Sequence, residues 1–157
     1  MLFRSIQADL RSFDSQGVFG LTAITAITAQ NSSAVNAVKV LSTRMVRAQI
    51  DAVVGDFPVA AVKTGMLASA AIVRLVAAYA ASTPHLPWVI DPVMIASSGA
   101  TLLAADAQHG VRELLLPRAC VLTPNVPEAE SLLGRPLRQQ RQLERAAEDL
   151  RALGPQA

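Results

Sequence analysis

Apolar residues recur along this chain with two different periods that follow one another in turn. In residues 6–15 they recur at the three-to-four-residue spacing of an amphipathic helix, whereas in residues 18–29 threonine alternates with apolar positions, as in a buried strand. Short apolar runs and longer helical patterns then alternate to the end of the chain. We expect helices at residues 6–15, 44–54, 69–81, 104–115, 127–133 and 139–153, and strands at residues 18–29, 35–40, 59–62, 88–90 and 119–122.

Strands that alternate with helices are typical of right-handed βαβ units, in which parallel strands form a sheet and helices cover its faces. The sequence therefore predicts an α/β protein with a three-layer α/β/α fold around a mostly parallel sheet. Its 157 residues suit a single domain. Residues 35–40 give the weakest strand pattern, and we expect them at a sheet edge or in a flap.

The composition narrows the class of protein further. Hydrophobic residues make up 52% of the chain and charged residues 17%, which fits a sheet buried on both faces. The formal net charge of +2 is too small to indicate a nucleic-acid partner. Cys120 is the only cysteine, so no disulfide forms within the chain, as is usual in a reducing cytoplasm. No apolar run reaches the roughly 18 residues of a membrane span, and we expect a soluble, cytoplasmic protein.

Polar loops follow three of the predicted strands, at the point where each strand ends. They are Gly65 and Met66 with their loop, then Asp91, then Asn125 and Glu128, in chain order. Because the carboxyl ends of parallel strands meet at one edge of a sheet, and ligands bind at that edge, we expect these residues to cluster. Gln30 closes the strand at residues 18–29 and would join them if that strand runs parallel to the others.

Each of these polar residues also has a purely structural interpretation. Asp91 could bind a cation or orient a phosphate, but an Asp-Pro pair also starts turns. Asn125 and Glu128 could hold a metal-bound water, but their spacing is also that of a helix capping box. Gln30 suits the edge of a heterocycle because it both donates and accepts hydrogen bonds, or it is a turn residue bonded to backbone.

Five sequence words occur in a fixed order and carry a resemblance to one family. They are Ile-Gln-Ala-Asp-Leu from residue 6, Thr-Ala-Ile-Thr-Ala-Gln-Asn from residue 25, Lys-Thr-Gly-Met-Leu from residue 63, Asp-Pro-Val-Met from residue 91 and Leu-Thr-Pro-Asn-Val-Pro-Glu-Ala from residue 122. Together they closely resemble the hydroxymethylpyrimidine/phosphomethylpyrimidine kinases of thiamine biosynthesis, in the ribokinase-like superfamily. The resemblance covers nearly the whole chain.

The resemblance implies a phosphotransferase that uses ATP and acts on the hydroxymethyl group of 4-amino-5-hydroxymethyl-2-methylpyrimidine, then on its monophosphate. By position, Gln30 would hydrogen-bond the aminopyrimidine. Gly65, Met66 and Val93 would line the pocket for the ring. The implied partner is therefore a small-molecule substrate, and the family's habit of forming dimers adds a homodimer to the expectations.

The same resemblance implies a magnesium and phosphate site. Asn125 and Glu128 match the superfamily's Asn-x-x-Glu motif, which orders Mg²⁺ and its waters near the phosphates, and Asp91 would lie beside them. Positioning and charge neutralisation supply most of the catalysis in phosphoryl transfer, so these roles suit the implied reaction.

The chain also departs from the family pattern. The family begins with a strand and a Ser-Gly-Gly-Ala-Gly turn, which residues 1–5 replace here, and a lysine of the family stands here as Ser97. The family's later Lys-Gly-Gly strand and its Gly-Thr-Gly-Cys/Asp segment, which supplies the anion hole and the catalytic base, find no match. We therefore expect a single partial ribokinase-like domain at residues 1–157, with no catalytic base of its own and no pyrimidine kinase activity in isolation.

Two alternatives stay open on the sequence. One is a pyridoxal/pyridoxine kinase relative from the same superfamily, although Gln30-Asn31 and Gly65-Met66-Leu67 favour the pyrimidine kinase. The other is a non-catalytic remnant that binds a pyrimidine or a partner chain.

Overall fold

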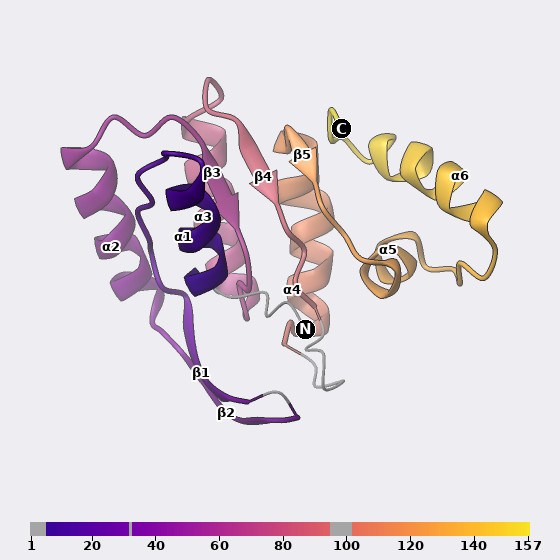
Figure 1. The fold of residues 1–157 in the computed structure, drawn as a ribbon, viewed down its shortest axis with the longest axis horizontal. Coiled ribbons are helices and arrows are strands. Elements are labelled where there is room, and N and C mark those ends of the chain that lie inside the picture. The colour runs from indigo at the N-terminus through magenta and orange to yellow at the C-terminus, as the bar shows by residue number, and fades with distance from the viewer. Residues whose placement is uncertain (1–5, 32, 95–101) are drawn as a thin grey trace.

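The centre of the fold is a parallel sheet of three short strands. The computed structural model describes residues 6–31, 33–94 and 102–157. The strands are β3 (Val62–Thr64), β4 (Trp88–Ile90) and β5 (Val121–Leu122), in the order β3-β4-β5 (Figure 1). Thr64 pairs with Ile90 and Ile90 pairs with Leu122, so the three carboxyl ends lie side by side. The expected α/β fold is confirmed.

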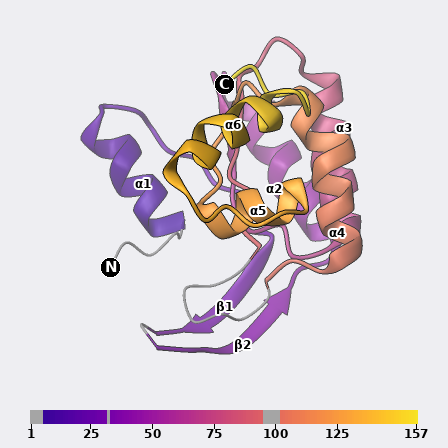
Figure 2. The ribbon, with the colours of Figure 1, turned by 90° about the vertical axis from the view of Figure 1, so that its right-hand side faces the viewer.

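Helices flank this sheet on both faces. In Figure 2, α3 and α4 lie on one side of the sheet and α1 on the other. The helices are α1 (Ile6–Ser15), α2 (Thr43–Asp56), α3 (Ala70–Ser82), α4 (Ala105–Gly110), α5 (Val126–Leu133) and α6 (Gln140–Arg151), and α4 continues through a π-helical turn, η1 (Val111–Leu115), and a 3-10 turn, η2 (Leu116–Arg118). No helix among these described residues is long and apolar enough to cross a membrane.

The buried core lies between the sheet and the helices α3 and α4 that cover one of its faces. Ile72 and Val73 of α3 are fully buried, and so is Leu115 of η1. Ile90 of β4 and Met94 after it are each only 1% exposed, which places the end of β4 inside this core. Ser69 caps α3, since its side chain accepts a hydrogen bond from the backbone of Ile72. The candidate site edge is therefore supported by the best-packed part of the fold.

The strand predicted at residues 18–29 is wrong in extent and in burial. The structure has β1 only at Ala26–Gln30, and β1 pairs antiparallel with β2 (Val35–Val40) in a separate two-stranded sheet. Alternation of threonine with apolar residues indicates one exposed face, and a hairpin supplies that exposure whereas a buried parallel strand does not. Figure 1 shows this hairpin projecting beyond the edge at which β4 and β5 end. The weak strand expected at residues 35–40, at a sheet edge or in a flap, is confirmed as the strand β2.

Smaller boundary errors have local causes. The strand predicted at residues 59–62 begins only at Val62, where the backbone N–H bonds the carbonyl of Pro87 and the pairing with β4 starts. The helix predicted to run to residue 115 stops being α-helical after Gly110 and continues as the π-helical turn.

Away from the sheet, a hydrogen bond from Tyr79 to Asp51 joins α3 to α2. Burial raises the pKa of Tyr79, and the hydrogen bond to Asp51 raises it further.

The last residues of the chain extend the sheet. The backbone N–H of Ala157 donates to the carbonyl of Cys120 at 3.0 Å, and the N–H of Leu122 donates to the carbonyl of Ala157 at 2.9 Å. Gln156 adds a further bond to Ala119. These residues therefore run parallel to β5 along the side opposite to β4.

Candidate functional site

The carboxyl ends of the three parallel strands form one continuous edge. The N–H of Asp91 donates to the carbonyl of Thr64 at 3.3 Å, and the N–H of Thr123 donates to the carbonyl of Ile90 at 3.0 Å. The loops that begin at Gly65, Asp91 and Thr123 therefore start as neighbours, as the sequence predicted. This edge is the candidate site.

A lysine joins two carboxylates at this edge. Lys63 Nζ lies 2.9 Å from Asp9 Oδ2 of α1 and 3.2 Å from Asp91 Oδ2. The Asp91 side chain is 9% exposed, whereas those of Lys63 and Asp9 are 22% and 34% exposed. Lys63 offsets much of the hydration that the buried Asp91 carboxylate loses, because the opposite charge lies within hydrogen-bond distance. It also fixes α1 against the sheet.

Asn125 and Glu128 form the capping box that their spacing allows. The N–H of Asn125 donates to Glu128 Oε2 at 2.8 Å, and the N–H of Glu128 donates to Asn125 Oδ1 at 2.9 Å. Glu128 is only 1% exposed. The structural interpretation of this pair is thus confirmed. A role toward Mg²⁺ is compatible with it, since a carboxylate has two oxygens and several lone pairs.

The donor set fits a magnesium ion that is also held by phosphates. No group of three or more His, Cys, Asp or Glu side chains in residues 6–31, 33–94 and 102–157 is arranged to enclose a metal. Asp91 and Glu128 both follow neighbouring strand ends and offer hard oxygen ligands. Mg²⁺ commonly takes one or two protein carboxylates, with water and substrate phosphates completing its shell. These two carboxylates would be its protein ligands.

The loop after β3 is held in an unusual backbone conformation. Ala68 has a φ of +61°, and the N–H of Ser69 donates to the carbonyl of Leu67 at 2.7 Å, which makes a tight three-residue turn. The carbonyl of Met66 accepts a hydrogen bond from the Thr25 hydroxyl, which lies just before β1. Strained turns of this kind cluster at binding sites, so this loop has the character expected of a substrate loop.

Gly65 and Val93, both predicted to line a ring pocket, lie around one small cavity. Its volume is about 10 Å³, and Thr64 and Asp91 line it as well. That volume holds one water-sized group and not a pyrimidine ring. A ring would lie outside this cavity, over the strand ends. Met66 is half-buried in the same loop.

Gln30 is not brought to the sheet edge by strand pairing. It ends β1 in the antiparallel hairpin and its side chain is exposed. The condition under which it would join the other residues, a parallel strand, is not met. A contact between Gln30 and a substrate would depend on the hairpin lying over the edge. Ser97, where the family pattern has lysine, lies outside the described residues.

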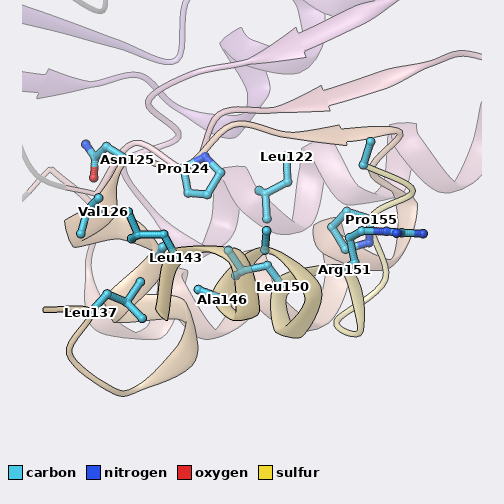
Figure 3. A pocket seen from close by; sticks show the side chains of 13 residues that line it. Leu122, Pro124, Asn125, Val126, Leu137, Leu143, Ala146, Leu150, Arg151 and Pro155 are labelled. Carbon is cyan, nitrogen blue, oxygen red and sulfur yellow. The ribbon is translucent and has the colours of Figure 1, made fainter. Parts of the chain in front are cut away.

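An apolar groove of about 320 Å³ lies between the end of β5 and α6, and Asn125 is one of its lining residues. Figure 3 shows Leu122 and Pro124 along one wall and Leu143, Ala146 and Leu150 of α6 along the other. Asn125 stands at one end of the groove and Pro155 at the other. The groove offers few polar groups, so it does not resemble a phosphate site.

Sequence reasoning missed three residues of this edge. Asp9 and Lys63 are 54 positions apart, and only the fold brings them together. Their sequence words, Ile-Gln-Ala-Asp and Lys-Thr-Gly-Met, were the available signal, because each places a charged residue within a recognised motif. Thr64 gave no signal, since a threonine at a strand end is ordinary.

Comparison with known proteins gives the same family as the five sequence words. Residues 5–157 match the family model of phosphomethylpyrimidine kinase. The hydroxymethylpyrimidine/phosphomethylpyrimidine kinase of Haemophilus influenzae is 44% identical over 149 residues, which cover 95% of this chain and 55% of that protein. This chain thus spans about half the length of the curated relatives that it matches.

Solved structures agree in fold. The crystal structure of phosphomethylpyrimidine kinase from Clostridium difficile 630 superposes with a TM-score of 0.88 at 39% identity, over 96% of this chain and 67% of that one. The pyridoxal kinase from Staphylococcus aureus, in complex with AMP-PCP and pyridoxal, gives a TM-score of 0.83 at 29% identity, over 96% of this chain and 54% of that one.

Proposed function

Because this chain belongs to the phosphomethylpyrimidine kinase family, we propose that it contributes the pyrimidine- and magnesium-binding edge of an ATP-dependent kinase of thiamine biosynthesis. Its fold is the ribokinase-like α/β fold of that family. The substrates would be 4-amino-5-hydroxymethyl-2-methylpyrimidine and its monophosphate. The observation that carries the proposal is the meeting of Gly65, Asp91 and Asn125 loops at one sheet edge.

The proposed roles follow from the position of each group. Gly65, Met66 and Val93 would contact the pyrimidine ring, because they come from adjacent loops at the ends of β3 and β4. Gln30 would reach the ring from the hairpin, where its amide is exposed and can both donate and accept. The substrate therefore would lie between the strand ends and the flap.

Asp91, Asn125 and Glu128 would serve the nucleotide end of the site. Mg²⁺ supplies charge neutralisation for the phosphates when it is bound, and these side chains would hold it or its waters in place. Use of ATP is supported by the family and by a structural neighbour, the pyridoxal kinase complex with AMP-PCP. We place the protein in the cytoplasm. A homodimer is also proposed, supported by apolar side chains left exposed on the hairpin, such as Ile27 and Val38.

Substrate preference is tested by calorimetric titration with two ligands. We expect 4-amino-5-hydroxymethyl-2-methylpyrimidine to bind at least about tenfold more tightly than pyridoxal, a difference of about 1.4 kcal/mol. Binding needs only the pyrimidine edge, whereas turnover needs the whole kinase, so the titration suits a chain that spans 55% of its relative. Equal or tighter binding of pyridoxal would assign the chain to the vitamin B6 kinases instead.

The metal role is tested by Glu128→Gln. The glutamine side-chain oxygen still accepts from the N–H of Asn125, so the capping box and the stability should change by less than about 1 kcal/mol. The negative charge is lost, so the heat of Mg²⁺-ATP binding should fall while Mg²⁺-free ATP binds as before. Glu144→Gln, at an exposed position of α6, is the matched control and should alter neither. Unchanged Mg²⁺ dependence in the Glu128 variant would leave that residue a helix cap only.

A further inference from the structure

We propose that Thr64 binds one ordered water molecule in the small cavity at the end of β3, and that this water ties together the two loops on either side. Thr64 would then be a positioning residue, which acts on the substrate loops through the water. The water site stands on the geometry alone. Its consequence for substrate binding rests on the proposed function.

The first observation is a buried hydroxyl without a partner. Thr64 is 5% exposed, and its Oγ1 has no hydrogen-bond partner among the described residues. Ile90, its pairing partner on β4, is 1% exposed, so the Thr64 side chain lies on the well-packed face of the sheet. A buried hydroxyl that bonds to nothing costs free energy, and folded proteins generally satisfy such groups with protein or with water.

The second observation is the size and lining of the cavity. Its volume of about 10 Å³ lies at the lower limit for one water molecule. Leu67, Leu103 and Val111 make most of its wall apolar, while Thr64 and the backbone turn at Asp91 are polar. A water here would accept from or donate to Thr64 Oγ1 and use the loop backbone as its second partner, since a buried water needs at least two.

The third observation explains why such a water would matter. The loop after β3 contains a bond from Ser69 N–H to the Leu67 carbonyl at 2.7 Å, and the loop after β4 contains one from Val93 N–H to the Asp91 carbonyl at 2.9 Å. Both are tight three-residue turns, and the first is centred on Ala68 at a φ of +61°. A water shared between them would limit their independent motion.

The sign of a stability change separates this proposal from its alternative. If Thr64 Oγ1 is bonded to water, Thr64→Val removes those bonds and strands the water, so the melting temperature should fall by roughly 2–4 °C. If the hydroxyl bonds to nothing, valine removes an unsatisfied group at nearly constant shape, and the melting temperature should stay the same or rise. A fall supports the proposal, and no change or a rise overturns it.

Three further measurements complete the test. Thr64→Ser keeps the hydroxyl and should exchange amide hydrogens at Gly65, Met66 and Met94 at nearly wild-type rates, whereas Thr64→Val should speed that exchange several-fold. Thr22→Val, at an exposed position, is the matched control and should change neither melting nor exchange. A high-resolution crystal structure should show density for water within hydrogen-bond distance of Thr64 Oγ1, and its absence would overturn the site.

The test of the water site is independent of the proposed function, because the melting temperature, the amide exchange rates and the electron density are all measured without a ligand. Pyrimidine binding should weaken several-fold in Thr64→Val and be restored in Thr64→Ser. Unchanged affinity, together with loss of the water and faster exchange, would overturn the positioning role and leave the kinase assignment intact. Failure of the wild-type chain to bind pyrimidine would contradict the proposed function, and the water site would still stand or fall on the melting temperature.

Discussion

Replacement of Lys63 by methionine should lower the free energy of unfolding by about 2–3 kcal/mol, somewhat less than the roughly 3–5 kcal/mol typical of a broken buried pair. The reason is Asp91, whose carboxylate is 9% exposed and would lose the cation 3.2 Å away. The loss stays below the typical range because the Lys63 side chain is 22% exposed and Asp91 has interactions besides this one. Methionine fills nearly the same volume, so the change reports charge and not packing.

Urea denaturation of Lys63→Met, Asp9→Asn and Asp91→Asn separates the two halves of this bridge. Asp9 is 34% exposed, so its contact with Lys63 is screened by solvent, and Asp9→Asn should cost less than about 1 kcal/mol. Adding Asp91→Asn to Lys63→Met should recover part of the lost stability, because the buried charge is then removed together with its partner. Equal losses in Asp9→Asn and Lys63→Met would show that the contact with Asp91 contributes little.

Gly154→Ala should destabilise the protein by about 3 kcal/mol, through backbone strain and a direct clash. Gly154 has a φ of +129°, which side chains with a Cβ rarely adopt. The added Cβ would lie 2.5 Å from Pro117 Cα and 3.0 Å from the Leu116 carbonyl oxygen, both backbone atoms that cannot rotate away. The tail would have to shift, and the bonds of Ala157 to β5 would weaken.

Gly55→Ala is the matched control for that change. Gly55 lies in α2 with nothing within 4 Å of the position its Cβ would take, so alanine should stabilise the helix by roughly 0.5–1 kcal/mol. Denaturation curves and the amide exchange rate of Ala157 provide the measurements. A Gly154 variant as stable as the wild type would mean that the tail moves freely without cost to β5.

The helices could be predicted from the sequence because their signals are local. The prediction for residues 6–15 matches α1 at both ends, and Gly17 has the left-handed φ of +69° expected after such a helix. Ser42 caps α2, and its side chain accepts from the N–H of Met45 at 3.2 Å. The Asn125–Glu128 box was correct for the same reason, since all its atoms lie within one helical turn.

The prediction of a strand at residues 18–29 was too long, because a strand forms only where the chain finds a partner to pair with. The alternation of threonine with apolar residues was correctly associated with β structure, but it does not say whether the partner is parallel or antiparallel. Only Ala26–Gln30 forms a strand, paired with β2, and the rest of the stretch belongs to neither a helix nor a strand. The distance of Gln30 from the sheet edge therefore depends on the position of the hairpin, which neither local propensity nor spacing determines.

The site residues divide in the same way. Gly65, Asp91 and Asn125 could be placed together because parallel strands share one carboxyl edge. The contact of Lys63 with Asp9 could not, since it joins α1 to β3 across 54 positions. The buried hydroxyl of Thr64, unpartnered among the described residues, could not be foreseen either, because it follows from how Leu103 and Val111 fill the space around it.

The capping box at the start of α5 makes Mg²⁺ binding at this site measurable through the backbone amides of the box itself. The side-chain oxygens that cap the start of this helix belong to the residues proposed to approach Mg²⁺, and they already accept hydrogen bonds from the Asn125 and Glu128 amides. A bound ion would draw electron density from these oxygens, and both reciprocal bonds would weaken. Backbone amide chemical shifts at Asn125 and Glu128 would then follow the metal concentration directly, without any label or coupled assay.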